Sequence, residues 1–254
     1  MKIGLVLSGG GIRGVAHLGV LNALKESGIT PNIISATSAG AIIGALYANQ
    51  IAPLDALRII KEINFLKFMR PAFRSPALLN LETAIPVFKE YIPHDSFSGL
   101  KIPLIISATN FNEGKLVYFS QGDLIRKILA SCCIPGIFNP IKIEGNYYVD
   151  GGILNNFPIE TLVPHCDVVI GSSCNHLENK SEFRNIKQVL ERAATLVMNS
   201  DLHQKQNSVD ILIEPKGIGE IGIFDLKKAE DIYSTAYEEA ILKINQNKEK
   251  LGLT

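Results

Sequence analysis

A continuous apolar run at residues 2–8, KIGLVLS, constrains the fold of this chain most strongly. Apolar side chains on both faces are typical of a parallel strand buried inside an α/β sheet. The run ends in the glycine loop SGGGIRG, and apolar residues then recur at helical spacing from Val15 to Leu24 until Gly28 stops the helix. Because a second apolar strand follows, the order predicts an α/β fold with a central, mostly parallel sheet.

The second strand, IISAT, leads directly into Ser38 and then into a helix rich in alanine and glycine. A serine at such an abrupt strand-to-helix turn is typical of a nucleophile elbow, and the small neighbours Ala36, Ala39 and Gly40 allow the flanking backbones to approach closely. Ala36 stands where the usual GxSxG motif has its first glycine. The stretch alone is also compatible with a serine that caps a buried helix.

The rest of the chain continues to alternate strands and helices. We expect strands at 102–110, 115–119, 141–149 (a hairpin around Glu144 to Asn146), 167–173 and 210–215. We expect helices from 39 to about 49, from Pro53, at 124–129, from Pro158 (a short one), at 186–197 (amphipathic), and at about 225–250, capped by Asp225. The even spread of apolar segments predicts a single domain over residues 1–254.

Composition argues against several classes of protein. Lysine plus arginine and aspartate plus glutamate number 25 each, so we expect no extended basic surface and no nucleic-acid partner. No segment offers roughly 18 uninterrupted apolar residues, and the N-terminal run is too short for a secretory signal. We therefore expect a soluble, cytoplasmic protein, whose oligomeric state the sequence does not indicate.

The four cysteines give no sign of a disulfide or a metal site. Cys166 and Cys174 bracket a predicted strand, which at about 3.3 Å per residue would hold them roughly 26 Å apart. They could then neither pair with each other nor share a metal ion with His165 and His176. We expect free thiols and no metal or cofactor.

The glycine loop Gly9 to Gly14 matches GxGxxG, which raises the alternative of dinucleotide binding. That fold needs an acidic residue about 20 residues further on, at the end of the second strand, and this end reads IISATS without a carboxylate. We favour another use of consecutive glycine N–H groups beside a helix N-terminus, which is the binding of a developing oxyanion. Arg13 adds a positive charge near the loop or is simply a solvated residue of the first helical turn.

Ser38 needs a base within hydrogen-bond reach, and the sequence offers one strong candidate. Asp150 follows an aromatic strand and precedes two glycines, which leave room for its carboxylate to point into a cleft. The alternatives are a triad with a histidine after Asp150, and a direct role for a histidine behind the glycine loop. These histidines are His165, His176, His203 and His17.

Four motifs in fixed order, GGGIRG, ATSAG, SCCIPGIFNP and VDGGILNNFP, resemble those of the patatin-like phospholipase family. The resemblance covers roughly residues 2–215, while the last 40 or so residues match no motif. It implies a three-layer α/β/α sandwich and a lipid acyl hydrolase that works through a Ser-Asp dyad without a metal. The residues that it implies are Ser38 as nucleophile, Asp150 as general base, and Gly9, Gly10 and Gly11 as the oxyanion hole with Arg13 nearby.

The implied substrate is a carboxylic ester of a lipid or phospholipid. Residues 65–74 mix aromatic and basic side chains between two prolines, which suggests a flap that touches a membrane surface or covers a pocket, although core packing is equally compatible. Ala36 departs from the family pattern, and its methyl group could narrow the elbow and lower the efficiency of catalysis. A regulatory or partner-binding protein on a hydrolase scaffold remains the non-enzymatic alternative.

Overall fold

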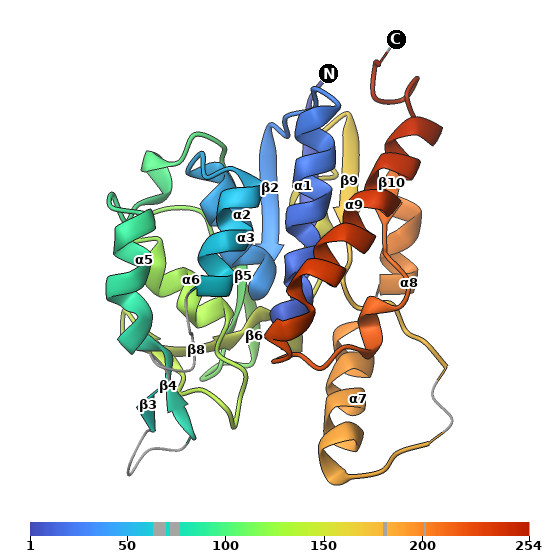
Figure 1. Ribbon diagram of the computed structural model, residues 1–254. Coiled ribbons are helices and arrows are strands. Elements are labelled where there is room, and N and C mark those ends of the chain that lie inside the picture. The colour runs from blue at the N-terminus through green and yellow to red at the C-terminus, as the bar shows by residue number, and fades with distance from the viewer. Residues whose placement is uncertain (63–69, 72–76, 180–181, 201, 254) are drawn as a thin grey trace.

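The computed structural model describes residues 1–62, 70–71, 77–179, 182–200 and 202–253 (Figure 1). Its strands are β1 (Ile3–Leu7), β2 (Ile33–Thr37), β3 (Arg70–Pro71), β4 (Leu79–Asn80), β5 (Leu104–Asn110), β6 (Lys115–Phe119), β7 (Ile141–Ile143), β8 (Asn146–Asp150), β9 (Val168–Ser172) and β10 (Ile211–Ile213). Its α-helices are α1 (Ala16–Glu26), α2 (Ala39–Ala48), α3 (Pro53–Glu62), α5 (Ile85–Tyr91), α6 (Ile125–Ser131), α7 (Ile186–Met198), α8 (Leu202–Lys205) and α9 (Ala229–Gln246).

Among the described residues, eight strands form one sheet in the order β10-β9-β1-β2-β5-β8-β7, with β6 paired to β5. The strands from β10 to β5 pair in parallel, whereas β6, β7 and β8 add antiparallel pairs at one side. The prediction of a central, mostly parallel sheet is therefore confirmed. The parallel strands place their carboxyl ends, and the loops that follow them, at one edge of the sheet.

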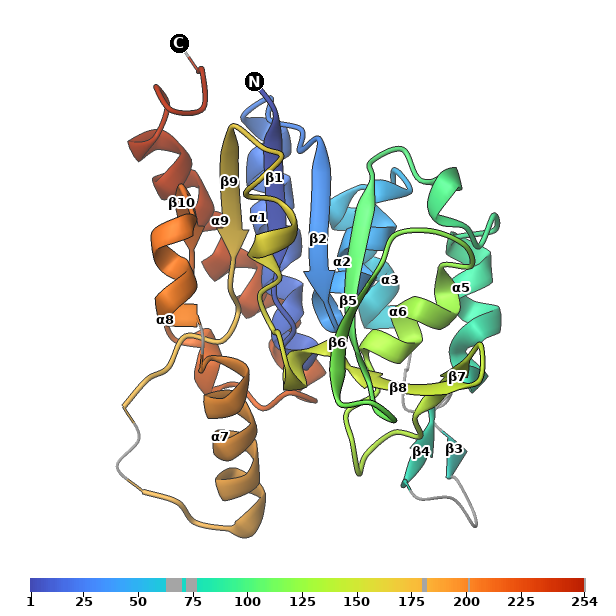
Figure 2. The ribbon, with the colours of Figure 1, turned by 180° about the vertical axis from the view of Figure 1, so that it is seen from behind.

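The sheet is buried on both faces, as the apolar run of β1 predicts. Ile3, Leu5 and Leu7 point into the main core, which includes residues of α1, α2, α3 and α9, and these helices cover one face of the sheet (Figure 1). Val6 packs instead in a smaller core with residues of 157–162 and α8. Figure 2 shows α8 on the face of the sheet opposite to α1 and α9. Both faces of the central strands are thus removed from water.

The C-terminal helix packs along α1, next to Gly19. A Cβ atom at Gly19 would lie 2.8 Å from Tyr237 N, which shows how closely the two helices approach. The prediction that Asp225 caps this helix is wrong. A 3-10 turn over Leu226–Lys228 precedes α9, so Asp225 lies too early to reach the first amides of the α-helix, and its side chain makes no capping bond.

The other predicted elements lie close to the observed ones, with a few differences. The short helix expected from Pro158 is a 3-10 helix over Ile159–Thr161, and α5 has no counterpart among the expected helices. The expected flap at 65–74 falls almost entirely outside the described residues. Within the described ranges, no helix combines the length and the apolar composition needed to cross a bilayer.

The close approach of α2 to β1 gives a stability test at Gly40. A Cβ atom there would lie 2.5 Å from Leu7 O and 2.6 Å from Ser8 O, and neither backbone oxygen can move away cheaply. Gly40→Ala should lower the free energy of unfolding by about 1–3 kcal/mol, although alanine normally favours a helix. Urea denaturation measures this change.

The matched control is Gly222→Ala, because a Cβ atom at Gly222 would meet no atom within 4 Å. That variant should unfold within about 0.5 kcal/mol of the wild type. Equal stability of Gly40→Ala and the wild type would contradict the close packing of α2 on β1.

Candidate active site

Ser38 occupies a strained backbone conformation between β2 and α2. Its φ of 51° and ψ of −122° lie in a region that residues with a side chain rarely adopt, as expected for a nucleophile elbow. The conformation is held from both sides, because Ser38 N–H donates to Ser131 Oγ at 2.8 Å and Ser38 C=O accepts from the Ala41 N–H at 2.8 Å. Ser131 Oγ in turn donates to Ser107 O.

The register of β5 brings Asp150 to Ser38. Thr37, the last residue of β2, pairs with Ser107, and Asp150, the last residue of β8, pairs with the adjacent Ala108. Two strands that are far apart in the sequence therefore end at neighbouring positions of a third. Gly151 must lack a side chain here, because a Cβ atom would lie 2.6 Å from Ser107 O.

The two side chains form a direct hydrogen bond in a buried site. Ser38 Oγ donates to Asp150 Oδ2 at 2.6 Å, while Asp150 Oδ1 accepts from the Gly152 N–H at 2.8 Å. Burial raises the pKa of Asp150 from 3.8 to about 6, because desolvation of the carboxylate outweighs the hydrogen bonds from Ser38 and Gly152, which lower it. A carboxylate with this pKa can take up the serine proton near neutral pH.

The glycine loop lies against Ser38, and its peptide planes are fixed by side chains. A Cβ atom at Gly9 would lie 2.9 Å from Ser38 Cβ, so a larger residue cannot stand there. Gly9 C=O accepts hydrogen bonds from Asn156 Nδ2 and Asn175 Nδ2, and Gly10 C=O accepts from Arg13 Nε at 3.4 Å. The C=O of one residue and the N–H of the next lie in the same planar trans peptide and point in opposite directions. The bonds to the carbonyls of Gly9 and Gly10 therefore also fix the directions of the Gly10 and Gly11 N–H groups.

Gly9, one of the three expected oxyanion donors, differs from Gly10 and Gly11 in the hydrogen bonding of its N–H group. Its N–H donates to Asn156 Oδ1 at 3.1 Å, so this amide already has an acceptor. Among the described residues, no acceptor is found for the N–H groups of Gly10 and Gly11, and both glycines line the pocket beside Ser38. Asn156 lies inside the motif VDGGILNNFP, and Asn175 lies in none of the four motifs. Neither contact with the loop could be predicted from local patterns, because each spans more than 140 residues.

Arg13 is buried rather than solvated. Only 2% of its surface is exposed, and besides Gly10 it bonds Gly219 O and Thr195 Oγ1. The guanidinium group thus connects the glycine loop with α7 and with a C-terminal turn. In addition, the Ile12 N–H donates to Ile223 O, which ties the loop to the same C-terminal segment.

No histidine whose side chain is described bonds Ser38 or Asp150. His17 is fully buried; its Nε2 donates to Ser8 O and its Nδ1 accepts from Ser172 Oγ, and burial lowers its pKa to about 4. His176 pairs with Glu214 through Nδ1, and His165 is exposed. His203 falls in α8, but its side chain lies outside the described part of the structure.

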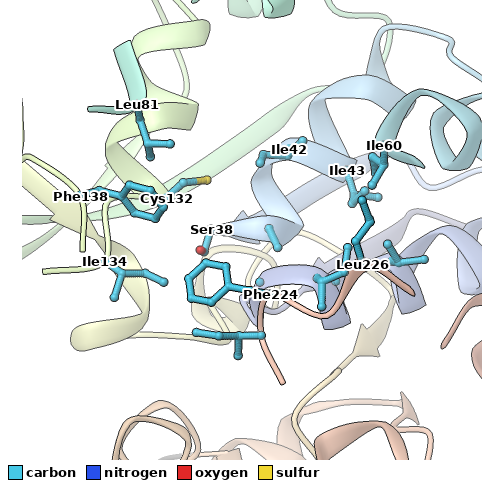
Figure 3. A pocket seen from close by; sticks show the side chains of 16 residues that line it. Ser38, Ile42, Ile43, Ile60, Leu81, Cys132, Ile134, Phe138, Phe224 and Leu226 are labelled. Carbon is cyan, nitrogen blue, oxygen red and sulfur yellow. The ribbon is translucent and has the colours of Figure 1, made fainter. Parts of the chain in front are cut away.

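Two cavities meet at Ser38. The first, of about 240 Å³, is the apolar pocket shown in Figure 3; Ser38 Oγ and the Cys132 thiol are the only polar side-chain groups among its described lining residues. The second pocket, of about 290 Å³, also reaches Asp150, Arg13 and Thr195. A bound substrate could therefore extend from the serine in two directions.

Apolar side chains surround the serine in the first pocket. Ile42, Ile43 and Ile60 lie on one side of it and Phe138 and Leu81 on the other, with the ring of Phe224 close by (Figure 3). Burial and the charge of Asp150 raise the pKa of Cys132, against a hydrogen bond with Ser38, so that its thiol stays neutral. The pocket can bind a hydrocarbon chain next to the nucleophile.

The four cysteines are free thiols. Cys166 lies beside Gly4 and Cys174 beside Gly10, at opposite ends of β1. Among the described residues, no three histidine, cysteine or acidic side chains are placed to hold a metal ion. Ala36 is fully buried in β2, where the main core takes up its methyl group.

Comparison with known proteins identifies relatives. Residues 5–163 match the patatin-like phospholipase family. An uncharacterized NTE family protein of Mycobacterium tuberculosis is 31% identical over 182 residues, which are 70% of this chain and 50% of that protein. The lysophospholipase NTE1 of Mycosarcoma maydis is 33% identical over 172 residues, which are 64% of this chain and 9% of that protein. The chain thus spans half or less of the length of these curated relatives.

A solved structure supports the fold. The crystal structure of VipD from Legionella pneumophila matches with a TM-score of 0.58 at 15% sequence identity, over 96% of this chain and 67% of that chain. This likeness agrees with the predicted three-layer α/β/α fold. Because the family match spans more than half of the sequence, the resemblance noted in the motifs is confirmed, and the chain belongs to the patatin-like phospholipase family.

Proposed function

We propose that this chain hydrolyses carboxylic ester bonds of lipids through an acyl-enzyme on Ser38, with Asp150 as the general base. The observation that carries the proposal is the 2.6 Å hydrogen bond from Ser38 Oγ to Asp150 Oδ2 at a strained elbow. The family match supports lipid hydrolysis as the class of reaction. The expectation of a Ser-Asp dyad thus remains our proposal for the mechanism.

In the first half of the reaction, Asp150 Oδ2 takes the proton of Ser38 Oγ while this oxygen attacks the ester carbonyl carbon. The tetrahedral intermediate collapses when the bond from carbon to the alcohol oxygen breaks. The leaving alcohol takes the proton from Asp150, and the acyl group stays on Ser38.

In the second half, a water molecule gives one proton to Asp150 and attacks the acyl carbon. The bond from carbon to Ser38 Oγ breaks, the serine takes the proton back, and the free acid leaves. Asp150 is a carboxylate at the start and at the end of each half. The serine proton leaves with the alcohol in the first half and is replaced by a proton of water in the second, so the steps balance without a metal ion.

Charge develops on the former carbonyl oxygen, and the glycine loop offers two donors for it. We assign this role to the N–H groups of Gly10 and Gly11, because the Gly9 N–H already donates to Asn156. One donor of this kind contributes about a hundredfold to a thousandfold in rate. Arg13 acts here as a positioning residue, since it holds the Gly10 carbonyl and so the plane of the peptide that carries the Gly11 N–H.

The two pockets suggest how a lipid ester binds. The first pocket, whose walls are apolar, suits the acyl chain, and the second, which contains Arg13 and Thr195, suits the alcohol part. Since the fungal relatives are named lysophospholipases, a lysophospholipid is the first substrate to test in a panel of lipids and simple esters.

The dyad is tested by removing each partner. Ser38→Ala and Asp150→Asn should each lower the rate of p-nitrophenyl butyrate hydrolysis by about a thousandfold or more. The first variant lacks the nucleophilic hydroxyl, and the second lacks the base that takes up its proton. A fluorophosphonate probe should label the wild type on Ser38 and leave Ser38→Ala unlabelled.

The controls are His176→Ala and His203→Ala, which should keep the wild-type rate. An active Asp150→Asn variant together with an inactive histidine variant would replace the dyad by a triad. A wild-type protein that resists the probe and hydrolyses no ester would favour the regulatory alternative, and tight NAD binding by that protein would favour the nucleotide alternative.

The pKa of Asp150 predicts the pH dependence of the reaction. Only the carboxylate form can accept the serine proton, and burial raises its pKa to about 6. The kcat/KM for a monomeric ester should rise about tenfold per pH unit below this value and level off above it. An activity that is constant from about pH 4 to about pH 8 would contradict the role of Asp150 as base.

The same pKa predicts that the catalytic carboxylate lowers stability. The folded state binds the Asp150 proton more tightly than the unfolded state, so stability falls as the pH rises from 3.8 to about 6. Asp150→Asn imitates the neutral form and should be more stable than the wild type by about 1–3 kcal/mol at high pH. Urea denaturation should show this gain at about pH 8 and lose it at about pH 4, and a gain that does not depend on pH would contradict the argument.

A further inference from the structure

The helix α7 exposes apolar side chains to solvent. Ile186 is 77% exposed and Leu190 is 63% exposed. We define the α7 face by its large exposed apolar residues, which are Ile186, Val189, Leu190, Leu196 and Val197. Their spacing places them within about a third of the helix circumference, as one stripe.

The side of α7 that faces the protein is polar. Thr195 and Asn199 are buried; Thr195 Oγ1 accepts from Arg13 Nη2, and Asn199 Nδ2 donates to Asn175 O. An amphipathic helix on a protein surface normally buries its apolar stripe and exposes its polar one. In α7 the orientation is the opposite, and no described part of the chain covers its apolar stripe.

The α7 face is continuous with the entrance to the catalytic site. Val197 and Met198 line the second pocket, together with Ile153, which is itself partly exposed. Leu154 and Phe224 are further exposed apolar residues near the two pockets. Figure 1 shows α7 extending past the carboxyl ends of the parallel strands. Ser38 directly follows the last residue of β2 and so lies at these ends.

We propose that the α7 face docks on a lipid surface and brings the pocket mouth to the boundary between lipid and water. This inference rests on the proposed function, since a hydrolase of lipid esters meets most of its substrate in bilayers and micelles. A helix that lies in the interface buries its apolar stripe among the acyl chains, as the α7 face would. A second copy of this chain on the same face would instead cover the entrance to the second pocket.

Binding is measured separately from catalysis by flotation with vesicles of ether-linked phosphatidylcholine, which has no carboxylic ester to cleave. The wild type and Ser38→Ala should bind equally. The double variant Ile186→Glu with Leu190→Glu should bind vesicles at least about tenfold more weakly. In the docked state, two charged groups would replace two aliphatic side chains that lie among the acyl chains. The neutral pair Ile186→Ser with Leu190→Ser should weaken binding in the same direction, and added salt should not weaken wild-type binding.

Leu242→Glu is the matched control, because Leu242 is 51% exposed on α9 and lines neither pocket. It should bind vesicles like the wild type, and every protein except Ser38→Ala should hydrolyse monomeric p-nitrophenyl butyrate at the wild-type rate. Vesicle binding that depends on Ile186 and Leu190 without any ester hydrolysis would support docking and reject the proposed function.

Two results would overturn the docking proposal. One is equal vesicle binding by the wild type and both double variants. The other is a wild-type dimer in analytical ultracentrifugation that Ile186→Glu with Leu190→Glu converts to monomers, which would assign the α7 face to a second copy of the chain.

Discussion

The hydrogen bond from Ser38 to Asp150 depends on the arrangement of the strands and of the core around it. It requires β2 and β8 to end at adjacent residues of β5, although 112 residues separate the two side chains. It also requires a strained backbone at Ser38 and a buried carboxylate, each of which lowers stability. The two-sided core around the parallel strands offsets these costs, since burial of apolar surface is the main favourable contribution to folding.

The glycine loop depends on the same arrangement in a different way. Glycine allows the loop to pass within contact distance of Ser38, but glycine also leaves the backbone free to move. Distant side chains remove that freedom: Asn156 comes from the turn after Asp150, Asn175 follows β9, and Arg13 connects to α7. Donors that are fixed before the reaction need no reorganisation when charge develops, which is why such a loop can act in catalysis.

The sequence predicted what local patterns encode. The apolar runs located most of the strands, and the small residues around Ser38 identified the elbow. Contacts between distant segments were beyond such patterns. Ser131 and Asn156 lie inside two of the four motifs, but a motif does not say which backbone group a side chain will bond, and Asn175 lies in no motif. Their bonds to Ser38 and Gly9 appear only in the folded chain. The predicted start of the last helix at Asp225 was wrong by a few residues, since α9 begins at Ala229. An aspartate is an equally good start signal for a 3-10 turn and for an α-helix.

The amphipathic pattern of 186–197 predicted a helix correctly, but periodicity cannot tell which stripe faces the protein. Here Thr195 and Asn199 face the protein, where Thr195 accepts a hydrogen bond from Arg13 and Asn199 donates one to the backbone of Asn175. Both residues also bond the glycine loop, Arg13 at Gly10 and Asn175 at Gly9. The apolar surface and the proposed oxyanion donors therefore share the same polar contacts. A helix that lies against lipid would then keep a fixed position relative to Ser38, the proposed nucleophile.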